Sequence, residues 1–122
     1  MKQSILAALI ALTPFGAVAQ EVVIGEEVPA RVTFCPTIEA AEQVVKTHKE
    51  EGFAAAVVIA SINCITHDVL VTPERVVSVW EVEKGKTMRV VQIKVRMADE
   101  SLTTHFMLVS IPVRSVKGAK DV

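Results

Sequence analysis

Two cysteines, Cys35 and Cys64, have the clearest potential for chemistry in this sequence. A redox-active pair is usually spaced as Cys-x-x-Cys, and zinc sites usually contain cysteines only a few residues apart. These two cysteines are far apart, so their spacing fits neither chemistry. We predict instead a structural disulfide, which would stabilise the fold by about 3.5 kcal/mol according to the chain-entropy relation for a loop of roughly 30 residues.

The three histidines, His48, His67 and His105, are the next candidates, because imidazole can bind metals and transfer protons. No two of them are two or four residues apart, the spacings that place ligands on one face of a strand or helix. His67 and Asp68 are adjacent, and a small enzyme or ligand carrier with a site near this pair is one hypothesis. The sequence contains no G-x-S-x-G, H-E-x-x-H, P-loop or G-x-G-x-x-G motif. We therefore expect no catalysis, no metal and no cofactor.

The first 19 residues have the order of a secretory signal peptide. Lys2 supplies a positive charge, Ile5–Leu12 is an unbroken apolar run, and the segment 17–19 has the small residues of a cleavage site. A membrane-spanning helix needs roughly 20 apolar residues, so this run is too short to be an anchor. We predict cleavage after Ala19 and a mature protein that is periplasmic or extracellular, with no membrane span.

The remaining length and charge are those of one nearly neutral domain. Removing 19 residues from the chain of 122 leaves 103. We expect a single domain over residues 20–114 and a flexible tail over 115–122. The formal charge is −1 for the whole chain and becomes −2 without Lys2. Such a domain lacks the basic surface that nucleic acids require, so we expect no nucleic-acid partner.

Two helices are predicted between the cysteines. Thr37 is a suitable N-cap for the first, apolar residues follow it at helical spacing, and Gly52 ends or bends it. Residues 53–62 are almost wholly apolar, and periodicity cannot distinguish a buried strand from a buried helix in such a run. We predict a second helix there because alanines favour helix. Residues 20–33 form a lead-in, in which 22–24 are either a short edge strand or part of a mobile arm.

The second half of the chain has alternating, valine-rich segments, which predict strands. We expect Pro73 to separate the first two strands and Lys84-Gly85 to form a hairpin turn. The predicted fold class is α+β: two N-terminal helices packed on one face of a four-stranded antiparallel meander, with one disulfide. The expected strands span residues 69–71, 75–82, 87–97 and 102–111.

The last hairpin defines a predicted interaction face. A turn at Ala98–Ser101 would place Met97 opposite Leu102, and the outward face would then carry a basic stripe in which Lys94 lies opposite His105. Exposed valines on that face would need cover, either from the N-terminal arm or from a second copy, and such a patch marks an interface. We predict a protein partner or a homodimer bound through the sheet face; simple solvation is the alternative for the basic stripe. The candidate interaction residues are Lys94, Arg96, His105, Val79, Val90 and Val109.

These expectations favour a small exported, non-catalytic binding protein. A signal peptide, one disulfide and a helix-plus-meander domain are shared by many small bacterial periplasmic proteins, including inhibitors and immunity proteins that neutralise lytic enzymes. This likeness is architectural, and no motif residue carries it. Two other hypotheses remain: a structural subunit of an envelope or phage-related assembly, and the enzyme or carrier with a site near His67 and Asp68.

Overall fold

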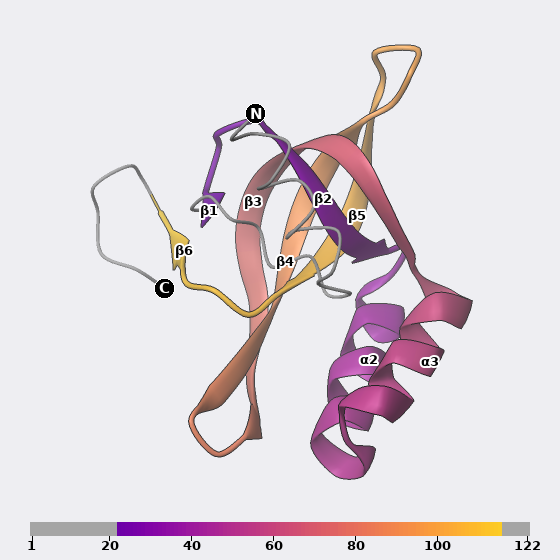
Figure 1. Cartoon of the computed structure of the whole chain (residues 1–122). Coiled ribbons are helices and arrows are strands. Elements are labelled where there is room, and N and C mark those ends of the chain that lie inside the picture. The colour runs from indigo at the N-terminus through magenta and orange to yellow at the C-terminus, as the bar shows by residue number, and fades with distance from the viewer. Residues whose placement is uncertain (1–21, 116–122) are drawn as a thin grey trace, which may run out of the picture.

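The computed structural model describes residues 22–115. Figure 1 shows a small β-barrel and, beside it, two helices that lie next to each other. The predicted signal peptide at residues 1–19 lies outside the described residues, as does all but the first residue of the predicted tail at 115–122. In chain order the elements are β1 (Val22–Val23), β2 (Val28–Cys35), α2 (Ile38–Glu51), α3 (Phe53–Asn63), β3 (Ile65–Glu83), β4 (Lys86–Arg96), β5 (Leu102–Val109) and β6 (Val113–Arg114).

The two predicted helices are present, and the local sequence accounts for their ends. Thr37 caps α2, because its hydroxyl accepts a hydrogen bond from the N–H of Ala40 at 3.0 Å. Gly52 ends α2 with a φ of 99°, which L side chains rarely adopt, and donates its N–H to the carbonyl of His48. The apolar run that follows forms α3, whose buried residues are alanines. Neither of these helices is long and apolar enough to cross a membrane.

Cys35 and Cys64 form the predicted disulfide. Cys35 is the last residue of β2 and Cys64 directly follows α3, so the bond closes the segment that contains both helices. The neighbouring residues Phe34 and Ile65 are paired across β2 and β3. The disulfide therefore lies where the helical hairpin leaves the sheet. Such a bond is compatible with an oxidising compartment outside the cytoplasm.

The strands β2, β3, β4 and β5 are antiparallel and form a closed barrel in that order. The long strand β3 pairs first with β2 and then, from Leu70 onward, with β4. The barrel closes where Phe34 and Cys35 of β2 pair with Met107 and Phe106 of β5. A strand of 19 residues can serve both neighbours because each of them covers only part of its length.

Apolar residues cover both faces of the strands and form two clusters. One cluster lies between the helices and the sheet, with Val90 and Leu108 fully buried in it. The other fills the barrel around Ile93 and Met107. The short parallel pair of β1 and β6, side by side in Figure 1, adds Val22 to the barrel cluster. The helices thus cover one apolar face, and closure of the barrel covers the other.

The segment before the helices differs from the prediction. Val28–Cys35 is a full strand of the barrel, where we expected only a lead-in. Val28, Ala30, Val32 and Phe34 belong to the barrel cluster and alternate with outward residues, which is the period-two pattern of a half-buried strand. Pro29 argued against a strand in the sequence, because proline within a run usually marks an edge or a break. Residues 22–23 do form a short strand, but it pairs with β6 rather than with the main sheet.

The segments on either side of Pro73 form one strand, not two as predicted. The ladder with β4 is irregular between Pro73 and Arg75, and a proline in a strand is usually found at such a bulge. The Pro73 carbonyl accepts a hydrogen bond from the N–H of Gly25 at 2.7 Å. The proline therefore interrupts the ladder locally without ending β3. The predicted turn at Lys84-Gly85 joins β3 to β4, and Gly85 has a φ of 77°.

The predicted register of the last hairpin is wrong by one residue. Leu102 pairs with Arg96 rather than with Met97, because the connection contains five residues, 97–101. Glu100 has a φ of 73° in this turn. A shift of one residue reverses which side chains of β5 share a face with a given side chain of β4. Both predicted faces of this hairpin therefore change composition.

Candidate functional site

A groove of about 800 Å³ lies between the first part of β3 and the tip of the β4–β5 hairpin. It is lined by residues 29–31 of β2, residues 65 and 67–70 of β3, and residues 96–98 and 100 at the hairpin tip. We name it the β3 groove. It contains His67 and Asp68, the adjacent pair that the sequence analysis singled out.

The groove exists because β3 changes its strand partner. Ile65–Val71 pairs with β2 and Leu70–Glu83 pairs with β4, so the two ladders overlap only at Leu70 and Val71. Strand β4 ends at Arg96, and the chain then turns back instead of following β3. The tip of this hairpin stands clear of the barrel at the upper right of Figure 1. A space is left where the two arms diverge.

Apolar side chains in the groove are unusually exposed. Ile65, Leu70 and Met97 have exposed fractions of 56%, 39% and 43%. A second groove of about 470 Å³ runs along α3 and shares Ile65 and His67 with the first. Exposed apolar side chains gathered in a concave surface are typical of a binding site.

The charged side chains on the β2 side of the groove are paired with each other. Arg31 and Asp68 are cross-strand partners, and their Nη1 and Oδ2 atoms are 3.3 Å apart. Nδ1 of His67 lies 3.0 Å from the main-chain oxygen of Asp68, and it must donate there because a carbonyl only accepts. The imidazole thus contacts the backbone and not the carboxylate. This geometry does not provide the His–Asp contact that orients and activates a catalytic imidazole.

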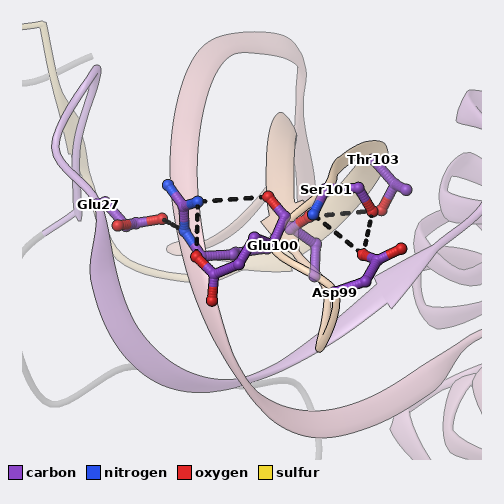
Figure 2. Close-up of polar contacts among 7 residues, drawn as sticks. Glu27, Asp99, Glu100, Ser101 and Thr103 are labelled. Atoms are coloured by element: carbon purple, nitrogen blue, oxygen red, sulfur yellow. Dashed lines mark hydrogen bonds and ion pairs between the residues drawn. The ribbon is translucent and has the colours of Figure 1, made fainter.

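Arg96 connects the hairpin tip to the segment between β1 and β2 (Figure 2). Its Nε donates to Oε2 of Glu27 at 2.8 Å, and its Nη1 lies 3.6 Å from Oε1 of Glu100. The hydrogen bond to Glu27, followed by the charge of Glu27, raises the pKa of Arg96 above its usual value. The guanidinium is therefore a permanent positive charge that ties this wall of the groove to the rest of the fold.

The turn at the hairpin tip is held by its own hydrogen bonds. Oδ1 of Asp99 accepts from the hydroxyl of Ser101 at 2.5 Å and from its N–H at 3.0 Å (Figure 2). These two bonds, the hydroxyl first, lower the pKa of Asp99 below its usual value. The N–H of Met97 donates to the Ser101 carbonyl at 2.8 Å. The second wall of the groove is thus a hydrogen-bonded turn.

The two cysteines and His48 lie outside the β3 groove. Over residues 22–115 no group of three or more His, Cys, Asp or Glu side chains is placed to hold a metal ion. Both cysteines are bonded to each other. The buried His48 lies outside the groove, where its Nε2 is 3.1 Å from Oε2 of Glu83 and links α2 to the β3–β4 hairpin.

The valines predicted to form an interaction face are separated. Val90 and Val109 are fully buried, Val90 beneath the helices and Val109 inside the barrel, so the prediction that they are exposed is wrong. Val79 is exposed on β3. The apolar faces that seemed to require a second copy or the N-terminal arm are mostly covered by the helices and by barrel closure.

The predicted basic stripe is also divided. Lys94 pairs with Thr104, and its Nζ donates to the Thr104 hydroxyl at 2.7 Å. His105 faces the barrel side, where its ring lies edge-on to Phe34 with centroids 5.0 Å apart. The shift in register separates Lys94 from His105, because successive residues of a strand point to opposite faces. Arg96 alone of the three lines the groove.

Most residues of the groove were not predicted as site residues, among them Arg31, Ile65, Leu70 and Met97. Ile65 precedes the predicted start of the first strand, and Arg31 falls in the segment expected to be a lead-in. The exchange of strand partners at Leu70 leaves no local pattern in the sequence, because it depends on where β4 ends.

Comparisons with known proteins do not assign the site. No protein-family model matches the chain, and neither a curated protein nor a solved structure matches it. The candidate site therefore rests on the geometry of residues 22–115.

Proposed function

We propose that this chain is a small exported protein that binds a protein partner in the β3 groove and catalyses no reaction. The observation that carries the proposal is the groove itself, about 800 Å³ in volume, with Leu70 and Met97 exposed in it. A preformed concavity with apolar lining and a few polar groups is the usual form of a binding site. The apolar lining supports binding, and the rim charges supply orientation.

The partner-binding role that we favour is that of an inhibitor or immunity-type module. Both walls of the groove are held in place before binding, by the ladder with β2 on one side and by the Arg96 and Asp99 contacts on the other. A preorganised surface loses little conformational freedom on binding, which favours affinity. Export to the periplasm or the exterior is supported by the N-terminal sequence pattern and by the compatibility of the disulfide with an oxidising compartment.

The proposal is tested by capture with matched variants. The oxidised protein is immobilised and exposed to periplasmic extract alongside Leu70→Asp, which places a charge in the groove, and Val79→Asp, which makes the same change at an exposed valine of β3 outside the groove. We expect a protein that is retained by the wild type and by Val79→Asp and is lost with Leu70→Asp. Circular dichroism confirms that each variant is folded. Equal retention by all three proteins, or no specific retention, contradicts the proposal.

A small-molecule carrier is the second candidate, because the groove contains His67 and Asp68. Nδ1 of His67 already contacts the backbone, so Nε2 is the imidazole atom that would contact a ligand. A low-molecular-weight fraction of the same extract is added to the ¹⁵N-labelled protein. Ligand-induced shifts in the signals of Val69 and Leu70 that are absent in His67→Gln, without a groove-dependent protein partner, favour the carrier.

A further inference from the structure

The main-chain groups of β3 that face the groove can be identified from one proline. Pro29 is paired with Leu70 and has no N–H to donate. Facing residues in an antiparallel ladder alternate between hydrogen-bonded and non-hydrogen-bonded pairs, so this pair must be of the second kind. The register then makes Val69 and His67 members of hydrogen-bonded pairs, so their main-chain groups bond to β2. The N–H and C=O groups of Asp68, which lines the β3 groove, and of Thr66, which lines the adjoining groove along α3, then point away from β2.

Two side-chain contacts agree with this assignment. The hydroxyls of Thr33 and Thr66 are 2.7 Å apart, and facing side chains approach most closely in non-hydrogen-bonded pairs. The carbonyl oxygen of Asp68 accepts a hydrogen bond from Nδ1 of His67, so a side chain reaches that oxygen. The same alternation directs the main-chain groups of Leu70 towards β4, where Leu70 pairs with Arg96.

This part of β3 is a strand edge that lacks a neighbour. Within residues 22–115, β2 pairs with one edge of Ile65–Val69, and the ladder with β4 on the other edge begins only at Leu70. Donors and acceptors two residues apart repeat every ~6.8 Å along an extended strand. Another extended chain matches that repeat, which is how peptides add to exposed sheet edges. The apolar groove runs along this edge.

We propose that the partner inserts one extended segment into the β3 groove, where it pairs with Ile65–Val69 as an added strand. This inference rests on the proposed function and specifies how the partner is recognised. Main-chain hydrogen bonds to Thr66 and Asp68 hold the segment. Successive side chains of the segment point to opposite faces, so apolar residues on one face contact Ile65 and those on the other face contact Leu70. A proline at a position that donates to β3 is not tolerated.

The second wall of the groove selects the occupant. The tip formed by residues 96–100 faces the free edge, so the occupant lies between two walls of the same chain. A second copy would bring its own β2 beside its β3, and that strand would meet the tip. The residues after 115 are a poor match, because 116–122 include Lys117, Lys120 and Asp121. A single apolar segment from another protein fits best.

The test uses a library of random 12-residue peptides displayed on phage and selected against the oxidised protein. We expect enriched sequences that bind the wild type and Val79→Asp and fail to bind Leu70→Asp. The tightest peptide is then synthesised with its backbone nitrogens methylated one at a time, which removes one N–H donor and keeps every side chain. Methylation at one alternating set of residues should weaken binding at least tenfold, and methylation of the intervening residues less than threefold.

A change in the protein provides the reciprocal measurement. Asp68→Pro removes an N–H that faces the groove and leaves the ladder with β2 intact, and it should also weaken peptide binding at least tenfold. Asp68→Asn is the control, because it removes the charge and keeps the N–H. Its affinity should stay within threefold of the wild type, and NMR spectra confirm the fold of both variants.

The inference is overturned if no peptide is enriched, or if methylation weakens binding without alternation along the peptide. It is also overturned if Asp68→Pro, with a native NMR spectrum, binds as tightly as the wild type. Suppose that a natural partner is lost with Leu70→Asp but that methylated peptides show no alternation. Binding in the groove is then supported, and strand addition is refuted. If methylation weakens peptide binding at alternate residues but no natural partner is found, the proposed function is refuted and strand addition at the free edge of β3 is supported.

Discussion

Removal of the disulfide is the perturbation whose effect can be worked out most directly from the structure. The bond joins residues separated by 29 positions, and the chain-entropy relation for a loop of this length gives a stabilisation of about 3.5 kcal/mol. In the folded protein, the ladder between β2 and β3 holds the same two points together, since Phe34 and Ile65 are paired. The bond therefore acts mainly by restricting the unfolded chain.

The double variant Cys35→Ala/Cys64→Ala should remain folded but be much less stable. With a urea dependence of about 1.3 kcal/mol per M for a domain of this size, the midpoint of unfolding should fall by about 2 to 3 M. The melting temperature should fall by about 15 to 25 °C. Equilibrium unfolding in urea, followed by circular dichroism at 222 nm, measures the change. The variant should lose part of the stability that a domain of this length typically has, about 5–15 kcal/mol.

Reduction of the wild-type protein is the matched experiment, because it breaks the bond without changing the sequence. The reduced wild type should unfold near the midpoint of the double variant, and reductant should not affect the variant. If reduction moves the midpoint by less than 0.3 M, the loop-closure account of Cys35 and Cys64 is refuted. The β2–β3 ladder and the helical packing would then determine stability alone.

Three further predictions concern the core, a helix end and the hairpin tip. Val90→Ala should lower the free energy of unfolding, measured in urea, by about 2 kcal/mol because Val90 is fully buried. Val79→Ala is the control and should change it by less than about 0.5 kcal/mol, since Val79 is exposed. Equal effects would contradict the assigned burial. Thr37→Ala should cost about 1 kcal/mol through loss of the helix cap, and Thr37→Ser should restore most of it. The lowered pKa of Asp99 stabilises the fold above the pKa of the unfolded side chain, about 3.9, and that contribution is lost as the pH falls through the lower folded value. Ser101→Ala should raise the pKa of Asp99 towards its usual value in an NMR titration, and an unchanged pKa would show that the Ser101 hydroxyl is not its main cause.

Local features of the structure were predictable from short stretches of sequence. Thr37 and Gly52 mark the ends of α2 because capping and positive φ depend on one residue and its immediate neighbours. Gly85 marks the β3–β4 turn for the same reason. The cysteine partners followed from there being only two in the chain. Each of these predictions needed no knowledge of distant contacts.

The candidate site was predicted only in fragments. His67 and Asp68 were noted as neighbours, and Arg96 was placed in a basic stripe, but nothing in the sequence brought these residues together in one groove. These residues come together because a five-residue turn follows Arg96 and because β3 extends beyond the residue that pairs with Arg96. The four-residue turn assumed from the sequence exchanged the faces of β5, since a shift of one residue inverts the alternation.

The sequence by itself determined the two helices, the disulfide, the β3–β4 turn and the mixed α+β character, because these depend on caps, periodicity and composition over a few turns of chain. Only the tertiary structure decided that the valine-rich strands close into a barrel, which buries Val90 and Val109 on opposite sides. It also decided that β3 exchanges β2 for β4 at Leu70, which leaves an edge open beside the hairpin tip. Strand partners are chosen by contacts between residues far apart in the chain, and no local pattern in the sequence records them.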